Sequence, residues 1–471
     1  MEMRKILIAG EWRPGSEEIL VRSPYSGAEI ANVASANEEE LLISITAAEE
    51  AAYSMRKLAR VEIAQGLRRI AGGIESRRDE FARTIALEAA KPMIYARGEV
   101  DRAVSTFSFA ASEAERFVGE VVPVDAQANG RGKFGYTLRK PLGIIYGITP
   151  FNFPLNLVAH KVAPALAAGN SIIIKPSPRT PLTALLLGEV FLDSGLPVSA
   201  LQVVPADVKY IDTVVNDDRV RMLSFTGSSA VGWDLKARAA KKHVALELGG
   251  NAPVIVDERA DDERALARTV TGAFAYSGQV CISVQRVYVH ESKFESWSKR
   301  FAERAGELQN GDPLDDATQL SVMIDEAAAK RAEEWIGEAI GGGAEHLCGG
   351  DREGAYIDAQ VLTKTDPEMK IVSEEVFAPI AVVEPFSKFE DAVEMANFGK
   401  YGLQAGVFTR DLANASYAAE NLAFGGVMIN DAPTFRTDNM PYGGSKESGF
   451  GREGIRFAME EMSERRVVVT E

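Results

Sequence analysis

Hydrophobic positions in the middle of the chain form short continuous runs separated by longer, amphipathic stretches. The first four runs are GIIYGI (143–148), SIIIKP (171–176), LQVVP (201–205) and VRMLSFTG (220–227). The stretches after the first, second and fourth runs predict helices over 155–168, 180–195 and 228–242. Runs of Val, Ile and Leu that alternate with helices indicate parallel strands buried on both faces, so the pattern predicts a doubly wound α/β fold.

A second series of the same kind follows directly. It comprises the run APVIVD (252–257), a predicted helix over 260–276, the run RVYVH (286–290) and a predicted helix over 292–309. We therefore place a domain boundary close to Gly249-Gly250. Near the C-terminus, RRVVVT (465–470) predicts a β-branched strand with no evident partner nearby, so it pairs either with another element or with another subunit.

The totals narrow the class of protein. With 471 residues, two cysteines and a net charge of −16, the chain suits a multidomain protein of a reducing compartment and disfavours electrostatic binding to nucleic acid or an anionic membrane. The apolar stretch in MEMRKILIAGEW is too short for a signal-peptide core and predicts an edge strand. No segment reaches about 18 apolar residues in a row, so no membrane span is expected. We expect a cytoplasmic enzyme or binding protein.

Two glycine motifs compete for the role of a phosphate site. GFGREG (449–454) satisfies G-x-G-x-x-G, but it follows turn formers rather than a strand, so we interpret it as a loop. In SFTGSSAVG (224–232), Gly227 and Ser228 follow a strand and open a helix, and Gly232 allows close approach. Free N–H groups and the positive end of the helix suit a pyrophosphate there, although a serine at a helix start is also a common cap.

Three polar residues stand at positions that suit covalent catalysis. Cys281 lies in GQVC ahead of a β-rich run, Glu247 ends a buried strand at the proposed boundary, and Asn152 lies in the loop TPFNFP after another strand. A thiol needs a base or a positive field to ionise, and an Asn amide can donate to an oxyanion. Taken singly, each has a plainer interpretation: a buried cysteine, a solvated carboxylate and a turn former.

Seven motifs occur in a fixed order along the chain. They are PFNFP, IIIKPSPRTP, SFTGSSAVG, LELGGN, GQVC, EEVFAP and MPYGGSKESGFGREG. In order and spacing they resemble the NAD(P)-dependent aldehyde dehydrogenase superfamily, closest to its branch of lactaldehyde, non-phosphorylating glyceraldehyde-3-phosphate and phosphonoacetaldehyde dehydrogenases. The resemblance implies that Cys281 attacks the aldehyde to give a thiohemiacetal and later a thioester, that Asn152 and the Cys281 N–H hold the oxyanion, and that Glu247 activates water.

The same resemblance implies a cofactor site and no metal. Its residues are Thr149, Phe151, Lys175, Gly227, Ser228, Glu375 and Phe377. Lys175 corresponds to the lysine that bonds the adenosine ribose and also supports catalysis. NAD-specific members often carry a glutamate three residues later, where this chain has Pro178. Without that carboxylate a 2′-phosphate is not repelled, and Arg179 or Lys175 could pair with it, so we expect NAD to be used and NADP to be tolerated.

A substrate pocket also follows from the resemblance. Its residues are Arg102, Phe153, Leu157, His160, Val280, Phe435, Arg436 and Tyr442. Val280 stands where members acting on phosphate or phosphonate aldehydes have an arginine, and His160 stands where enzymes for apolar aldehydes have tryptophan. We therefore expect a small polar or carboxylated aldehyde, such as lactaldehyde, glyceraldehyde or a semialdehyde. The plainer interpretations are a solvated charge for Arg102 and a loop salt bridge for Arg436.

The resemblance further implies three structural parts. These are an NAD(P)-binding domain (1–118 and 141–248), a catalytic domain (249–445) and bridging segments (119–140 and 446–471) that join subunits into a homodimer or homotetramer. Two other functions stay open: a CoA-acylating aldehyde dehydrogenase, a type that commonly lacks the glutamate matched by Glu247, and a catalytically inactive structural homologue. A cysteine hydrolase is disfavoured because no Cys–His pair is evident.

Overall fold

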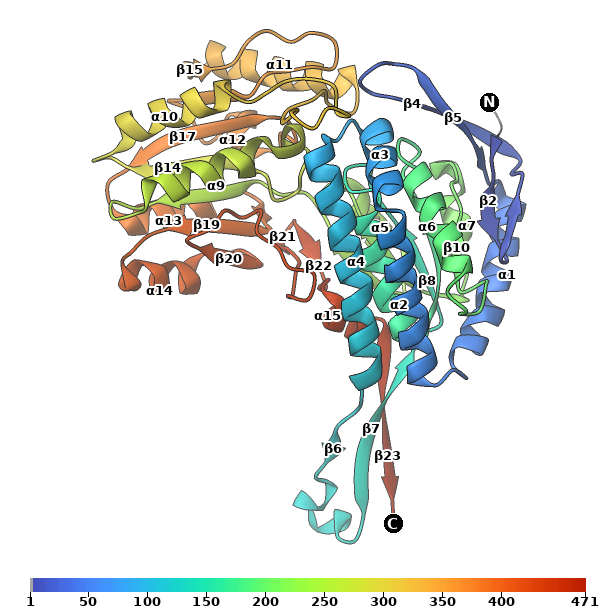
Figure 1. Ribbon diagram of the computed structural model, residues 1–471. Coiled ribbons are helices and arrows are strands. Elements are labelled where there is room, and N and C mark those ends of the chain that lie inside the picture. Colours follow the sequence, from blue (N-terminus) through green and yellow to red (C-terminus); the bar gives the residue numbers. More distant parts are fainter. Residues whose placement is uncertain (1–2) are drawn as a thin grey trace.

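Two α/β lobes and a projecting β arm make up the structure, a computed structural model that describes residues 3–471 (Figure 1). The first lobe is built on an eight-stranded sheet of order β22 (Gly449–Phe450), β12 (His243–Glu247), β11 (Val220–Thr226), β8 (Ile144–Ile148), β9 (Ser171–Lys175), β10 (Leu201–Val203), β2 (Ile6–Ile8) and β3 (Glu11–Arg13). The second is built on a seven-stranded sheet of order β15 (Glu345–Cys348), β16 (Gln360–Thr363), β17 (Ile380–Phe386), β14 (Val284–His290), β13 (Ala252–Val256), β19 (Gln404–Phe408) and β20 (Gly426–Ile429).

Helices cover both sheets. Those of the first lobe are α1 (Glu38–Met55), α2 (Arg60–Ser76), α3 (Arg78–Ala89), α4 (Met93–Arg116), α5 (Asn156–Ala167), α6 (Leu182–Leu192), α7 (Ile211–Val215), α8 (Ser229–Arg238) and α15 (Ile455–Glu461). Those of the second are α9 (Asp262–Phe274), α10 (Phe294–Gly306), α11 (Glu326–Gly341), α12 (Lys370–Ser373), α13 (Phe389–Asn397) and α14 (Leu412–Asn421). Across residues 3–471, no helix has both the length and the apolar character needed to span a membrane.

The parallel core of the first sheet explains the continuous apolar runs. Strands β8 to β12 all pair in parallel. Ile145 and Ile172 pack into the core formed with α2, α4 and α6, whereas Tyr146 and Ile173 point to the opposite face and pack with α1 and α8. Since helices cover both faces, successive strand residues are all buried and no polar alternation develops. The predicted doubly wound α/β class is confirmed.

Some segments lie elsewhere than expected. The N-terminal run forms β2 one place inside the sheet edge, because the chain turns at Gly10 and β3 pairs along its outer side. Residues 446–462, which we expected in the bridging part, lie largely on the first lobe, where β22 pairs with β12 and α15 packs on α5.

Two small sheets lie outside the two large ones and the arm. One contains β1 (Met3–Arg4), β5 (Glu29–Ser35) and β4 (Glu17–Arg22), and the other pairs β18 (Tyr401–Gly402) with β21 (Ser445–Lys446).

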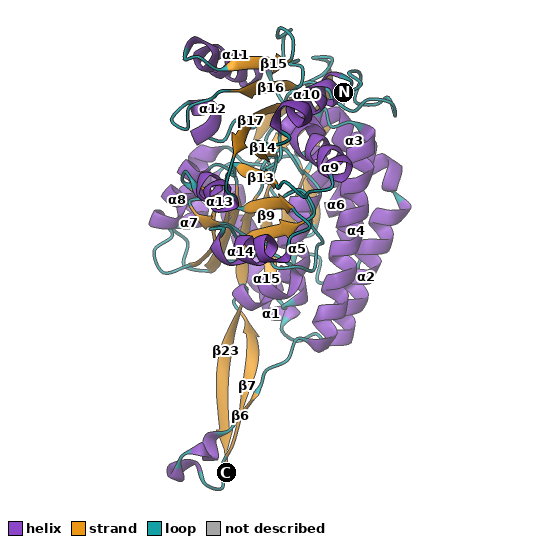
Figure 2. Ribbon diagram, turned by 90° about the vertical axis from the view of Figure 1, so that its left-hand side faces the viewer, coloured by secondary structure: helices purple, strands orange, loops and turns teal. Residues whose placement is uncertain are grey.

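The arm is a three-stranded sheet of order β23 (Ser463–Thr470), β7 (Phe134–Pro141) and β6 (Val121–Val122). β23 pairs antiparallel with β7 along its whole length. The last strand therefore finds a partner in its own chain. Figures 1 and 2 show the arm extending away from both lobes, with β23 at one edge of its sheet.

Candidate active site

A cavity of about 280 Å³ lies between the lobes, where β8, β11 and β12 of the first sheet end. Ligands of open α/β sheets collect at such carboxyl ends. Nine predicted residues line it: Phe151, Asn152, Leu157, Gly227, Ser228, Glu247, Cys281, Glu375 and Phe377. Nine others do not: Arg102, Thr149, Phe153, His160, Lys175, Val280, Phe435, Arg436 and Tyr442. The fold thus brings Cys281, Asn152 and Glu247 together from distant segments, whereas Lys175, which was also predicted to support catalysis, lies outside the lining.

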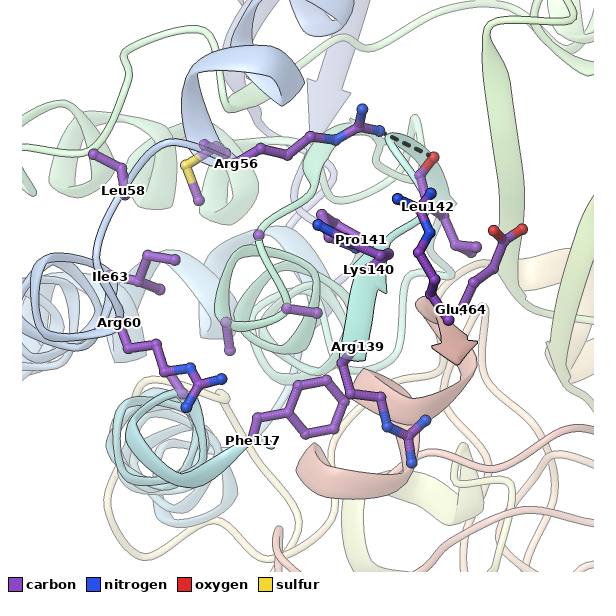
Figure 3. Close-up of a pocket in the computed structure, with 16 residues that line it drawn as sticks. Arg56, Leu58, Arg60, Ile63, Phe117, Arg139, Lys140, Pro141, Leu142 and Glu464 are labelled. Carbon is purple, nitrogen blue, oxygen red and sulfur yellow. Dashed lines mark hydrogen bonds between the residues drawn. The ribbon is translucent and has the colours of Figure 1, made fainter. Parts of the chain in front are cut away.

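A second cavity lies at the base of the arm (Figure 3). Its lining is rich in cationic side chains, among them Arg56, Arg60 and Arg139, with Phe117 and Glu464 beside them. It contains none of the residues predicted for catalysis, cofactor or substrate. The candidate chemistry therefore belongs to the cavity between the lobes.

Cys281 follows a tightly folded loop between α9 and β14. Three consecutive residues, Tyr276, Ser277 and Gly278, have φ angles of 51°, 53° and 65°. Left-handed backbone is unfavourable for the first two, which carry a Cβ. The Ser277 hydroxyl donates to the Ser321 carbonyl at 2.6 Å and offsets part of that strain. The sharp turn places Cys281 on the cavity.

The Cys281 thiol is neutral in this environment. Its Sγ lies 3.1 Å from the Tyr442 hydroxyl. Burial raises the pKa of the thiol to about 11. Because the thiolate is the nucleophilic form, the proton must pass to a base before the sulfur can attack a carbonyl.

Asn152 is tied to the loop that carries the thiol. Its Nδ2 donates to the Gln279 carbonyl at 2.9 Å, and the Gln279 side chain in turn accepts from the Ile324 backbone N–H at 2.9 Å. One amide hydrogen of Asn152 is thereby used, and none of residues 3–471 accepts the other. An N–H without a partner, in the cavity that the sulfur also lines, is the donor that an oxyanion requires.

Glu247 ends β12 as a buried carboxyl group. Burial, and then the charge of Glu453, raise its pKa well above the usual range. Glu453 stays ionised despite its own burial, because Lys161 at 3.3 Å and Arg436 at 3.2 Å hold its pKa at about 2. The Oε2 atom of Glu247 has no hydrogen-bond partner within residues 3–471. This carboxyl group can therefore accept a proton from another molecule once it ionises.

Arg102 and His160 meet at one carboxylate, Asp438, while Arg436 contacts His160 and pairs with Glu453. Arg102 Nη2 donates to Asp438 Oδ1 at 2.7 Å, and His160 Nε2 lies 2.8 Å from the same oxygen. Burial, followed by the charge of Arg436, lowers the pKa of His160 to about 4, so the ring is neutral near pH 7. The Arg436 guanidinium lies 3.6 Å from the centroid of the Tyr442 ring. A charged network thus stands directly behind the tyrosine that contacts the thiol.

Three charged members of this network were missed in the sequence: Lys161, Glu453 and Asp438. Lys161 interrupts the apolar helix NLVAHKVAPALA, and a buried lysine requires an anionic partner. Glu453 lies in GFGREG, which we interpret as a loop and as part of a family motif, with no role assigned to its glutamate. Asp438 lies two residues after Arg436 in a loop. The lysine was the one available signal, and it did not identify its partner.

The start of α8 suits an anionic ligand. Ser228 occupies the cap position without a side-chain capping bond, and the buried Thr226 hydroxyl beside it has no partner among the described residues. A Cβ on Gly227 would lie 2.5 Å from the Phe225 ring, so the turn needs glycine. Gly232 serves packing instead of ligand approach, because a Cβ there would lie 2.3 Å from Leu248. Free N–H groups and an unpaired hydroxyl fit a pyrophosphate.

The other predicted cofactor residues lie on both lobes. Glu375 accepts from the Gly250 N–H at 2.8 Å, and burial raises its pKa to about 7. The Phe377 and Phe151 rings pack edge to face, with 6.0 Å between their centroids. Lys175 ends β9, is 5% exposed, and has its pKa lowered by burial. Its carbonyl accepts from the Thr149 N–H at 3.2 Å.

Three predicted pocket residues have other surroundings. Phe153 packs against Tyr276 and the Lys91 ammonium group, which removes it from the cavity. Phe435 is 41% exposed. Val280 packs beside Cys281 on a small cluster that includes Leu403 and Tyr442. These surroundings are set by the tertiary structure, and the residue types alone do not predict them.

Comparison with known proteins identifies the family to which this chain belongs. The profile described as "Aldehyde dehydrogenase family" matches residues 12–468. The chain belongs to this family. An aldehyde dehydrogenase 21 from Physcomitrella patens, solved with the reaction product succinate, is 40% identical with a TM-score of 0.98 and covers 100% of this chain and 98% of its own. A glyceraldehyde-3-phosphate dehydrogenase from Methanocaldococcus jannaschii, solved with NADP, is 37% identical with a TM-score of 0.93, over 97% and 99%.

Curated aldehyde dehydrogenases give the same result. A 3-sulfolactaldehyde dehydrogenase of Priestia aryabhattai is 38% identical over 466 residues, which cover 98% of this chain and 97% of the relative. A lactaldehyde dehydrogenase of Methanococcus aeolicus is 37% identical over 469 residues, covering 98% and 99%. The family and the α/β fold expected from the motifs are confirmed.

Proposed function

We propose that this aldehyde dehydrogenase oxidises a small polar or carboxylated aldehyde to the carboxylic acid with NAD(P), through a thiohemiacetal and a thioester on Cys281. One observation carries the proposal: the Cys281 thiol, the Asn152 amide and the Glu247 carboxyl group line one cavity. A nucleophile, an oxyanion donor and a base are the groups that this chemistry needs.

In the first step the Cys281 thiol loses its proton to solvent, and the sulfur bonds to the aldehyde carbon. The carbonyl electron pair moves to oxygen, where the free N–H of Asn152 stabilises the charge. Hydride acceptance is the chemistry that a bound nicotinamide supplies; Ser228 and Glu375 would help to hold that cofactor. Loss of the hydride and its electron pair leaves a thioester on Cys281.

Glu247 completes the cycle. Its carboxylate takes a proton from water, and the water oxygen attacks the thioester carbon. The carbon–sulfur bond then breaks, the acid leaves, and the sulfur departs as a thiolate ready for the next aldehyde. The presence of this base favours hydrolysis over transfer of the acyl group to CoA, so we expect turnover that does not depend on CoA.

The charged network supports a polar substrate. Arg436 is a buried cation whose Nε lacks a partner in the described part of the chain. Arg436 lies behind Tyr442 and does not line the cavity, so a hydroxyl or carboxylate group of the substrate would have to reach past that ring to accept from this donor; an apolar aldehyde offers no such acceptor. The relatives are named for sulfolactaldehyde and lactaldehyde, and one solved relative holds succinate.

A panel of aldehydes tests this substrate class. We expect kcat/KM for lactaldehyde, glyceraldehyde or succinic semialdehyde to exceed that for hexanal by about tenfold or more, because only the polar compounds carry groups that can accept from the unpaired Arg436 donor. The measurement is NAD(P)H absorbance with purified enzyme, each aldehyde being assayed with and without CoA. Preference for hexanal contradicts the substrate class, and an absolute need for CoA contradicts the hydrolytic step.

Cofactor choice gives a second prediction. Pro178 offers no carboxylate to repel a 2′-phosphate, and Arg179 is held at 2.7 Å by Asp325. We expect NAD to be used and NADP to be accepted, with kcat/KM values that differ by less than about a thousandfold. Initial rates at saturating aldehyde with each cofactor measure the ratio. Larger discrimination against NADP overturns the expectation.

We also propose that copies of this chain associate into a homodimer or homotetramer through the arm. Val121 is 69% exposed and Val467 is 61% exposed. The arm projects away from the lobes in Figure 1, so the lobes do not cover these side chains. The free edge of β23 leaves backbone groups unpaired in the isolated chain. Apolar exposure and an open strand edge together favour contact with another subunit.

A further inference from the structure

One buried ion pair lies between the two loops that carry Asn152 and Cys281. Lys91 precedes α4 and Glu99 lies within it, and the side chains of both are 0% exposed. Lys91 Nζ donates to Glu99 Oε2. Burying two charges this deeply costs free energy unless hydrogen bonds and opposite charges compensate for the lost hydration. Their contacts extend to both loops.

Glu99 fixes the loop of Asn152. Its Oε1 accepts from the backbone N–H groups of Leu155, at 2.9 Å, and Asn156, at 3.0 Å. These are among the otherwise unpaired donors at the start of α5. A side chain of α4 therefore caps the helix that begins directly after the Asn152 loop.

Lys91 joins that loop to the loop of Cys281. Its ammonium group lies 3.6 Å from the ring centroid of Phe153, the residue after Asn152, and 4.5 Å from that of Tyr276. The two rings pack edge to face, with 6.4 Å between their centroids. Tyr276 is the first left-handed residue of the turn before Cys281, and its hydroxyl donates to the Ala89 carbonyl at 3.0 Å. One cation thus contacts an aromatic ring from each loop.

We propose that the Lys91–Glu99 pair is a positioning element that sets the Asn152 amide against the Cys281 sulfur. The inference rests on the proposed function, because it takes its meaning from the roles of those two residues. Lys91 is not among the residues that line the cavity. It acts through Phe153 and Tyr276, and its loss allows the two loops to separate.

A double-mutant cycle tests the proposal. Lys91→Met is expected to lower kcat for the aldehyde by about 10–100-fold, because small misplacement of reacting groups carries losses of this size. If Lys91 acts through the oxyanion donor, the same substitution in an Asn152→Ala background should cost less than about threefold. Because alkylation of Cys281 by iodoacetamide uses no oxyanion, its rate should stay near the wild-type value. Lys57→Met, which removes an exposed ammonium group 3.9 Å from the Tyr53 ring, is the matched control.

The outcomes are distinct. An equal loss from Lys91→Met in both backgrounds, wild-type kcat in Lys91→Met, or wild-type kcat in Asn152→Ala each overturns the positioning role. Should Lys91→Met fail to fold, Lys91→Met/Glu99→Gln removes both buried charges, keeps an oxygen to cap α5, and enters the same cycle with the same expectation. If the wild-type protein forms no NAD(P)H with any aldehyde, the proposed function itself fails.

Discussion

Replacing Cys281 by alanine is expected to lower kcat for aldehyde-dependent NAD(P)H formation by about 10⁴-fold or more, the scale of loss when a covalent nucleophile is removed. Among residues 3–471 the Tyr442 hydroxyl is the one side-chain group hydrogen-bonded to the sulfur, and burial raises its pKa well above the usual range, so it is a poor replacement nucleophile. Steady-state absorbance kinetics at saturating cofactor measure the loss.

Cys348 supplies the matched control. It lies on β15, where its Sγ is 3.8 Å from the Ala359 carbonyl, and it does not line the cavity. Cys348→Ala should therefore keep near-wild-type kcat. Activity of Cys281→Ala within about tenfold of wild type would remove the covalent route from consideration.

Glu247→Gln is expected to reduce steady-state turnover by about 10²–10⁴-fold, the usual contribution of a general base. The first turnover should survive as a burst of NAD(P)H, because the thiol gives its proton to solvent and Glu247 is needed only after the hydride has left. Stopped-flow absorbance resolves the burst from the slow steady state. Glu258→Gln, an exposed change beyond β13, is the control and should leave both phases unaltered.

The raised pKa of Glu247 adds a pH dependence to the same experiment. Burial and the charge of Glu453 favour the protonated form, so the active carboxylate appears only above its raised pKa. Wild-type steady-state turnover should therefore increase with pH until Glu247 ionises. Glu247→Gln should lose that increase. A variant without a burst, or with the wild-type pH profile, is incompatible with the assigned role.

Local pattern predicted the elements better than their assembly. The continuous apolar run SIIIKP (171–176), for example, correctly predicted strand β9, because both faces of that strand are buried. The strand β23 was predicted too, but its pairing with β7 joins residues more than 300 positions apart, as Ser463 with Pro141. Nothing in a local run of Val residues records which distant segment it meets.

The residues of the candidate site also differ in how far the sequence predicts them. Cys281, Asn152 and Glu247 stand in contiguous motifs whose glycines and strand ends are visible in the sequence. Lys161 and Glu453, which lie 292 positions apart, form a pair only after folding. The residues proposed for the chemistry could thus be chosen from the sequence, whereas the residues that set the charge around them could not, because a pKa depends on three-dimensional neighbours.

The most direct test of the account is to look for the acyl group on the sulfur. Glu247→Gln is mixed with an accepted aldehyde and NAD(P), quenched in acid and digested, and its peptides are weighed by mass spectrometry. The account predicts that the Cys281 peptide gains the mass of the aldehyde less two hydrogens, since the bound group is an oxidised acyl chain. A Cys281 peptide of unchanged mass while NAD(P)H accumulates in the burst, or the same adduct on Cys348, would contradict it.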